Sequence, residues 1–456
     1  MNVIPNYVSD EQLAGARVVV MGLGRFGGGV GVTRFLVGRG ANVLVTDMAD
    51  AATLQTPLNA LSDLKIDYRL GSHDVADLDG ADLLVVSPAV DRTKSAFVQA
   101  ALNRGIAWTT EIGMFIERCP GRMIGVTGSI GKSTTCAMLH CILESERARA
   151  SANHRRTFLG GNIGRSLLGD LTEMTADDLI VLELSSFQLE ALPNLTGDWP
   201  VVGITNIAPH HLDRHGGYET YIDAKLNLIR GMSLGASAVV GRVDDSVRKG
   251  IEALVRYHKG HTIKADILSE HFDLQVPGPH NQMNAQFAAL IARQLGVELD
   301  ASRAALKDFG GLAHRIQYAD SVDGVRYYND SKSTSVEAID TALRSFAEPV
   351  VLLCGGKDTG SELERIKNCT WQSVRAVVSF GDAAKRLADM IGTLEENKRP
   401  KIVQSEQTID AAIAKARTIA QSGDVVLLSP GCPSYDAFSN YEERGDAFIA
   451  AVKSLR

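Results

Sequence analysis

The feature that most constrains this chain is an apolar run that enters a glycine-bearing turn and continues as a helical pattern, over residues 123–139. The turn and the start of the helix read Gly128-Ser129-Ile130-Gly131-Lys132-Ser133-Thr134. Glycines let successive backbone N–H groups point at a phosphate, and a helix N-terminus adds partial positive charge. Lys132 can reach the outer phosphates, and the Ser133 hydroxyl can bind Mg²⁺. The pattern predicts a site for a nucleoside triphosphate.

This loop is a shortened variant of the common phosphate loop. The strict eight-residue spacing requires glycine at position 126, where the chain has Val126. A simple glycine turn before a helix would account for the glycines. It would not account for Gly-Lys-Ser-Thr directly after a buried strand, so we favour the nucleotide site.

Length and composition bound the class of protein. A chain of 456 residues predicts about three domains, and 45% apolar with 22% charged residues is typical of a globular protein with large cores. The net charge of −7 argues against a general nucleic-acid binder, because phosphate backbones require a basic face. With no signal-like N-terminus and no apolar run of about 18 residues, we expect a cytoplasmic protein without membrane insertion. We expect its six cysteines to be reduced packing residues.

The first part of the chain has the pattern of a dinucleotide-binding fold. An apolar run at 17–22 leads into the glycines of 22–27, and a second strand, 42–47, ends in Asp47 about twenty residues later. In this fold the acid accepts hydrogen bonds from a ribose. The same turn serves any nucleotide diphosphate, so it is weak evidence for a nicotinamide cofactor. A third strand at 82–88 favours a parallel sheet.

The second part adds candidate metal ligands to the phosphate loop. Glu183 ends a buried strand, as a Mg²⁺-binding carboxylate would, and a strand at 201–206 runs into His210 and His211. Three protein ligands at zinc spacing are missing, so we favour Mg²⁺ with one histidine. Lys225 lies in a helical pattern, and spacing alone favours a solvated lysine there.

The third part predicts another doubly wound sheet, with apolar strands at 349–354, 375–380 and 424–429. The expected fold is therefore α/β with a Rossmann-like N-terminal domain, a central P-loop domain and a C-terminal Rossmann-like domain. We place their boundaries at 1–119, 120–314 and 315–456. The pair Asn281 and Asn284, at the start of a helix, could read a base edge or cap the helix.

Several short motifs occur together and in order along the whole chain. They are Gly128–Thr134, Gly161–Gly164, Glu183–Leu189, His211–Arg214, Ala224-Lys225, His280-Asn281 with Asn284, His314-Arg315, Asn329–Thr334 and Ser429–Cys432. In these motifs the chain resembles the Mur ligases of peptidoglycan synthesis, and among them the member that adds D-glutamate to UDP-N-acetylmuramoyl-L-alanine. The resemblance implies ATP-dependent amide formation: the substrate carboxylate attacks the γ-phosphate, and the amine then displaces phosphate.

The resemblance also implies roles for individual residues. Lys132, His211, Lys225 and Lys332 would be catalytic, with Lys225 carbamylated by CO₂. Two Mg²⁺ ions would be held by Ser133, Glu183, His211 and the Lys225 carbamate. ATP would be held by Gly128, Ser129, Ile130, Gly131, Lys132, Ser133, Thr134, Asn281, Asn284, Arg315 and Asp330. The UDP-linked substrate would contact Gly24, Arg25, Phe26, Asp47, Gly71, Asn162 and Ser185, and D-glutamate would contact Thr334, Lys357, Ser434, Tyr435 and Tyr441.

The chain departs from the family at Ile130, at Arg25-Phe26 and at Tyr435, beside the phosphate, uracil and glutamate positions. The alternatives are another Mur-type amino-acid ligase, folylpolyglutamate synthase, or a P-loop ATPase that is not a ligase. The Asp-Asn-Pro-Arg signature of the diamino-acid enzyme is absent. A nicotinamide dehydrogenase would explain residues 17–47 alone. We expect a monomer whose partners are small molecules.

Overall fold

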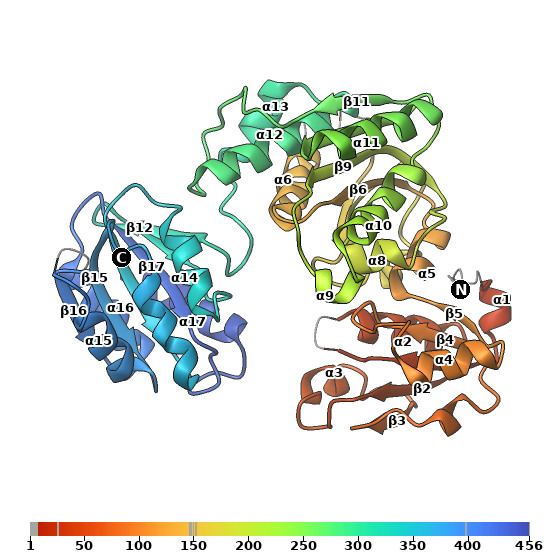
Figure 1. Cartoon of the computed structure of the whole chain (residues 1–456), viewed down its shortest axis with the longest axis horizontal. Helices are drawn as coiled ribbons and strands as arrows, with labels where there is room; N and C mark the ends of the chain where they lie inside the picture. The colour runs from red at the N-terminus through yellow and green to blue at the C-terminus, as the bar shows by residue number, and fades with distance from the viewer. Residues whose placement is uncertain are drawn as a thin grey trace. The chain divides into compact units, whose positions relative to one another are not determined.

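The computed structural model describes residues 8–24, 27–145, 148, 150, 153–396 and 399–455. They form three sheets with helices packed on them (Figure 1). The chain falls into two compact units: the first holds the two N-terminal sheets with Asn284–Ala304, and the second holds His271–Met283 with the C-terminal sheet. No helix in the described ranges combines the length and apolar character that a membrane crossing requires.

The first sheet has five parallel strands in the order β3-β2-β1-β4-β5. The strands are β1 (Arg17–Met21), β2 (Asn42–Asp47), β3 (Asp67–Leu70), β4 (Leu83–Val86) and β5 (Ala107–Thr109). The helical segments are α1 (Asp10–Leu13), α2 (Gly28–Gly38), α3 (Gln55–Asn59), η1 (Val75–Leu78), α4 (Ala96–Asn103) and α5 (Glu111–Arg118). The strands predicted at 17–22, 42–47 and 82–88 are confirmed as β1, β2 and β4.

The central sheet has six parallel strands in the order β11-β10-β9-β6-β8-β7. The strands are β6 (Arg122–Thr127), β7 (Thr157–Gly161), β8 (Leu179–Glu183), β9 (Asp198–Asn206), β10 (Ser237–Arg242) and β11 (His261–Lys264). The helical segments are α6 (Lys132–Glu144), η2 (Leu168–Asp170), α8 (Ser186–Glu190), α9 (Leu212–His215), α10 (Tyr218–Arg230), α11 (Asp245–Tyr257), α12 (Pro279–Gln294) and α13 (Leu299–Leu306). The central strands β6 and β8 are buried nearly throughout, as both faces of a parallel sheet must be.

The C-terminal sheet has the order β12-β13-β17-β14-β15-β16, with an antiparallel β12/β13 edge and parallel pairs elsewhere. The strands are β12 (Gln317–Val322), β13 (Val325–Asn329), β14 (Val350–Gly355), β15 (Val374–Phe380), β16 (Ile402–Ser405) and β17 (Val425–Gly431). The helical segments are α14 (Val336–Leu343), η3 (Gly360–Asn368), α15 (Ala384–Gly392), α16 (Ile409–Ile419) and α17 (Tyr441–Lys453). The predicted α/β class with three sheet-based parts is confirmed.

The first two sheets share one hydrophobic core. Side chains of α2 and α5, such as Leu36 and Phe115, belong to the same buried cluster as Leu168 of η2 and Trp199 of β9. Contacts therefore run continuously from the helices of the first sheet to an interior strand of the central sheet. This packing fixes the first glycine turn relative to the phosphate loop.

Candidate active site

The phosphate loop joins β6 to α6 and requires glycine at two positions. Gly128 has φ +147° and Gly131, the N-cap of α6, has φ +86°. A Cβ atom on Gly128 would lie 2.0 Å from Thr205 Oγ1, and one on Gly131 would lie 2.6 Å from Asn284 Oδ1. Backbone freedom and lack of space thus both select glycine here.

The end of β9 holds this loop in shape. Ser129 N donates to Asn206 O at 2.9 Å, Ile130 N donates to Asn206 Oδ1 at 3.1 Å, and Thr205 Oγ1 donates to Ile130 O at 2.8 Å. No side chain caps the start of α6, so the N–H groups of its first turn are available to an anion. The Ile130 side chain is 70% exposed and makes no contribution to the cradle.

Glu183 and Asn162 form the polar centre beside the loop. Glu183 ends β8 and is 2% exposed, and its Oε1 accepts from Asn162 Nδ2 at 2.9 Å. Its other oxygen, Oε2, is buried and has no hydrogen-bond partner among the described residues. Buried carboxylate oxygens are rarely left unpaired, and hard oxygen is what Mg²⁺ binds. The residues present therefore fit the predicted Mg²⁺.

Lys225 is buried against the same loop. The expectation of a solvated lysine, drawn from spacing alone, is therefore wrong. It is 1% exposed, and its Nζ donates to Gly128 O at 2.8 Å and lies 4.6 Å from the centre of the Tyr221 ring. Burial, with a further contribution from the charge of Lys132, lowers the pKa of Lys225 to about 7. Near neutral pH much of this amine is therefore uncharged and nucleophilic.

The histidine turn packs against α8. His211 has φ +53° and is the N-cap of α9, and its ring centre lies 5.0 Å from that of Phe187. Burial lowers the pKa of His211, which favours the neutral, metal-binding form of the ring. Within the described ranges, no three His, Cys, Asp or Glu side chains gather as a metal site by themselves. A cation here would need ligands such as the Ser133 hydroxyl, water or substrate.

The first sheet presents a second glycine turn, at the end of β1. Asp47 Oδ2 accepts from Leu23 N at 2.8 Å and from Gly24 N at 3.1 Å, so this carboxylate organises the turn itself. Gly71, with φ +85°, follows β3 and donates its N–H to Ala49 O at 3.0 Å. The predicted substrate residues Arg25 and Phe26 lie outside the described residues. A ribose contact by Asp47 stays a prediction.

Ser185, another predicted substrate residue, caps α8. Its Oγ accepts from Gln188 N at 3.2 Å, and Gln188 Oε1 accepts from Ser185 N at 2.9 Å. This capping box explains the Ser-Ser-Phe-Gln sequence structurally. A substrate contact by Ser185 stays a prediction.

In the second unit, the predicted ATP residues come from three places: Asn281 lies in α12, Arg315 precedes β12, and Asp330 directly follows β13. Arg315 is exposed, whereas Asn281 is buried with Nδ2 donating to Pro277 O at 2.7 Å. Asp330 is also buried: its carboxylate accepts from Ile316 N at 3.1 Å and Ser429 Oγ at 3.0 Å, as well as from Ser333 Oγ. Burial raises the pKa of Asp330 to about 6.

The predicted amino-acid residues lie at the carboxyl edge of the C-terminal sheet. Thr334, Lys357 and Ser434 follow the parallel strands β13, β14 and β17, whose carboxyl ends share one edge. Tyr441 begins α17, and Lys332 Nζ lies 5.4 Å from its ring centre. Lys357 pairs with Asp382 at 3.1 Å, and Tyr435 is 62% exposed.

Arg444 is a residue that the sequence reasoning missed. It is fully buried, and Nε donates to Ser331 Oγ at 3.0 Å while Nη1 and Nη2 donate to Cys432 O at 3.1 Å and Ser331 O at 2.9 Å. Nη1 also lies 3.4 Å from Gly355 O. One guanidinium thus joins the loops that follow three strands. Arg444 lies within a helix whose sequence pattern is ordinary, so the sequence did not indicate that this arginine is buried or that it joins these loops.

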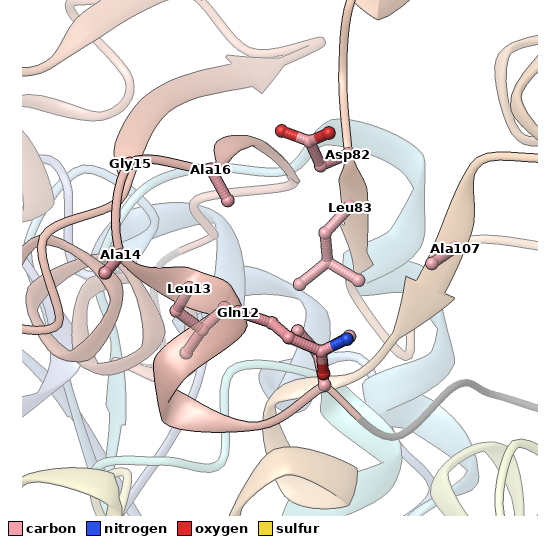
Figure 2. A pocket seen from close by; sticks show the side chains of 9 residues that line it. Gln12, Leu13, Ala14, Gly15, Ala16, Asp82, Leu83 and Ala107 are labelled. Atoms are coloured by element: carbon pink, nitrogen blue, oxygen red, sulfur yellow. The ribbon is translucent and has the colours of Figure 1, made fainter.

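A pocket also opens at the opposite, amino-terminal edge of the first sheet (Figure 2). The side chains of Asp82 and Leu83 lie across it from Gln12 and Leu13 of α1. None of the predicted site residues lines it, so it is separate from the candidate active site. A smaller pocket at the carboxyl edge of the C-terminal sheet includes Thr334 and Arg365.

Comparison with known proteins gives matches to three family models. A MurD-like N-terminal domain of Mur ligases matches residues 16–109, a Mur ligase middle domain matches 126–267, and a Mur ligase glutamate ligase domain matches 314–432. Relatives named UDP-N-acetylmuramoylalanine--D-glutamate ligase include one from Roseiflexus sp. (strain RS-1), 36% identical over 97% of this chain and all of its own length. Another, from Geobacter metallireducens, is 34% identical over 97% of this chain and 98% of its own length.

Solved structures agree in fold. The UDP-N-acetylmuramate-alanine ligase MurC of Thermotoga maritima matches with a TM-score of 0.56 at 18% identity, covering 96% of this chain and 100% of that one. The MurF ligase of the same organism, solved with ADP, matches with a TM-score of 0.51 at 16% identity, covering 100% and 99%. At these identities the likeness concerns the fold alone.

Proposed function

Because this chain belongs to the Mur ligase family, we propose that it is an ATP-dependent ligase that joins D-glutamate to UDP-N-acetylmuramoyl-L-alanine in peptidoglycan precursor synthesis. The relatives that carry this name align over nearly the full length of both chains. The observation that carries the proposal is the centre around the phosphate loop: the glycine cradle, the unpaired oxygen of Glu183 and the buried amine of Lys225.

The first step requires two negative groups to meet. A carboxylate oxygen of the substrate attacks the γ-phosphorus of ATP, the bond to the bridging oxygen breaks, and ADP leaves. The N–H groups at the start of α6 and the Lys132 ammonium would offset the charge of the phosphates, while Asn162 holds Glu183 in place. The amine of D-glutamate then attacks the acyl carbon, phosphate leaves, and the nitrogen loses a proton.

We propose that Ser133, Glu183, His211 and Lys225 hold Mg²⁺ at two positions. When bound, Mg²⁺ would neutralise phosphate and carboxylate charge during the transfer. Lys225 would do so as a carbamate, formed when its neutral amine adds to CO₂ and loses a proton. The buried position of its amine and its lowered pKa support this step.

We assign the remaining substrate contacts by unit. In the first, Gly24, Asp47, Gly71, Asn162 and Ser185 would hold the UDP-linked substrate, and Asn284 the nucleotide. In the second, Asn281, Arg315 and Asp330 would hold ATP, Lys332 would assist catalysis, and Thr334, Lys357, Ser434, Tyr435 and Tyr441 would hold D-glutamate. The last group is supported by Thr334, Lys357 and Ser434 following three parallel strands.

We further propose domains at 1–119, 120–314 and 315–456, which the three separate sheets and the limits of the three family models support. Its substrates would be small molecules only, and we propose a monomer. Its use of ATP and a nucleotide-linked precursor supports action in the cytoplasm.

The test is the substrate dependence of ADP release. We expect release only when ATP, UDP-N-acetylmuramoyl-L-alanine and D-glutamate are all present. Equal rates with L-glutamate or meso-diaminopimelate would contradict the specificity. Release of ADP without any amino acid would instead indicate a P-loop ATPase.

A further inference from the structure

Three elements meet at the Ser166 side chain. Ser166 Oγ donates to Glu111 Oε1 at the start of α5 and accepts from Leu168 N at 3.3 Å in η2. On the other side lies Gly31 of α2, where an added Cβ atom would come within 2.2 Å of Ser166 Cβ. The segment before η2 is thus fastened to two helices of the first sheet.

The other end of this segment is hydrogen-bonded to Glu183, the proposed Mg²⁺ ligand. Asn162 N donates to Glu183 O at 2.7 Å, and its Nδ2 donates to Glu183 Oε1 at 2.9 Å. A Cβ atom on Gly161 would lie 2.2 Å from Glu183 O, so the two backbone segments are in close contact at this point. Residues 161–166 therefore connect the centre of the central sheet with the helices of the first.

Helix α2 continues this connection to the first glycine turn. It begins at Gly28, one turn before Gly31, directly after the turn that Asp47 organises. The proposed substrate is long: its nucleotide end belongs at this turn, and its carboxylate belongs at the phosphate loop. The spacing between the two must therefore be fixed by protein contacts, and the Ser166 contact lies on that path.

We propose that Glu111 is a positioning residue for the nucleotide-linked substrate. Through Ser166 it holds residues 161–166 against α2 and α5, and so sets the distance between the first glycine turn and the Glu183–Asn162 pair. This inference rests on the proposed function, and Glu111 itself does not touch the reacting atoms.

The chemistry of Glu111 gives this contact a pH signature. Packing around the carboxyl group raises the pKa of Glu111 to about 7, and only the hydrogen bond from Ser166 opposes this. Charged groups on the elements packed against it have other partners: Arg165 pairs with Asp170, Arg34 with Asp63, and Arg118 with Asp10 and Glu117. Above pH 7 a negative charge thus develops at the Glu111–Ser166 contact, and none of these neighbouring cations pairs with it.

The experiment compares steady-state constants of Glu111→Ala, Glu111→Gln and Ser166→Ala with those of the wild type. For Glu111→Ala we expect the KM for UDP-N-acetylmuramoyl-L-alanine to rise about tenfold, the size of one buried hydrogen bond, with KM values for ATP and D-glutamate within about twofold. Ser166→Ala should give a similar rise, and the double variant should be no worse than either single one. The wild-type KM for the UDP-linked substrate should rise between pH 6 and 8.5, as Glu111 ionises. Glu111→Gln should have the wild-type KM at pH 6 and should not show this rise.

Glu117→Ala is the matched control. Glu117 lies on the same helix, its pKa is also raised to about 7 by burial, and its carboxylate is within ion-pair distance of Arg118 rather than bonded to Ser166. We expect its KM values to equal those of the wild type, with folding of every variant checked by thermal unfolding. The proposal is overturned if Glu111→Ala leaves the substrate KM unchanged, if all three KM values rise together, or if Glu117→Ala has the same effect.

Two further outcomes separate the possible failures. If Glu111→Ala does not fold, Ser166→Ala decides, and a wild-type KM in that variant overturns the proposal. If the wild-type chain itself releases no ADP in response to D-glutamate, the proposed function has failed instead.

Discussion

The two glycine turns of the first unit have the same backbone design and opposite charge. Each follows a buried parallel strand and ends in a left-handed glycine that begins a helix without a side-chain cap: Gly27 has φ +85° before α2, and Gly131 has φ +86° before α6. In the first turn, the Asp47 carboxylate accepts two backbone N–H groups. In the second, Lys132 and Lys225 donate to loop carbonyls.

We propose that this difference separates a turn that holds the UDP-linked substrate from a turn that activates its carboxylate. A turn whose N–H groups are already bound by an internal acid is suited to a rigid docking place for a nucleotide. A turn that leads into the uncapped start of α6, with two nearby amines and an unpaired carboxylate oxygen, can bring phosphate, carboxylate and cation together. We infer that the strand–turn–helix unit provides a place for a nucleotide. The charges around the turn then decide whether phosphoryl transfer can occur there.

The largest expected effect comes from removing the cation of the second turn. Lys132→Met should lower kcat at least about a thousandfold, because charge stabilisation of phosphoryl transfer in a dry site is the main catalytic contribution of such a loop. The KM for the UDP-linked substrate should stay within about twofold. ADP release measures both. The exposed Lys249→Met on α11 is the control, and a kcat near wild type in Lys132→Met would contradict the assignment.

Lys225→Ala should lower kcat about a hundredfold, and small carboxylic acids should partly restore the rate by supplying the missing anion. In the wild type, only the neutral amine can form a carbamate, and the pKa of Lys225 is lowered to about 7. The rate should therefore fall as the pH is lowered through about 7, and the acid-rescued variant should lack this dependence. Full activity of the untreated variant would remove the carbamate from the mechanism.

Much of this contrast could be predicted from the sequence because both turns are local patterns. An apolar strand, glycines at fixed offsets and a following helix lie within about thirty residues, and the central strands are near-continuous apolar runs. The edge strands β3, β11 and β16 were not predicted, because their residues are largely exposed and carry no such run. The strands β5, β7, β10, β12 and β13 were not predicted either, although β10 and β13 are mostly buried.

Contacts between distant residues set the rest of the site, and no local pattern reports them. Lys225 is buried because its helix packs below a loop 97 residues earlier in the chain. Glu111 and Ser166 are 55 residues apart, and Arg444 reaches a serine 113 residues away. The resemblance to a family pointed to Lys225, but it pointed neither to the Glu111–Ser166 contact nor to Arg444.

A matched pair of glycine variants sharpens the comparison at a smaller scale. Gly131→Ala and Gly27→Ala place the same methyl group at N-caps with nearly equal φ, so each costs about 1 kcal/mol of backbone strain. At Gly131 the methyl would also meet Asn284 Oδ1, whereas at Gly27 nothing lies within 4 Å. We expect kcat/KM for ATP to fall about thirtyfold in Gly131→Ala, and the KM for the UDP-linked substrate to rise only about twofold in Gly27→Ala.

Steady-state kinetics and urea unfolding of both variants provide the measurement. Equal losses in the two variants would mean that strain alone decides, and that the crowding around Gly131 is irrelevant. A larger effect in Gly27→Ala would reverse the ranking of the two turns.

The smallest expected effect tests whether Asp47 serves the turn or the chemistry. In Asp47→Asn the amide oxygen can still accept one hydrogen bond, but it cannot accept from Leu23 N and Gly24 N with a full negative charge. The turn should loosen by about 1 kcal/mol, which corresponds to a rise of about fivefold in the KM for the UDP-linked substrate. Because we propose that this site holds the substrate and takes no part in the chemistry, kcat and the KM for ATP should stay at wild-type values. A fall in kcat with an unchanged KM would place Asp47 in the catalytic machinery and erase the distinction between the two turns.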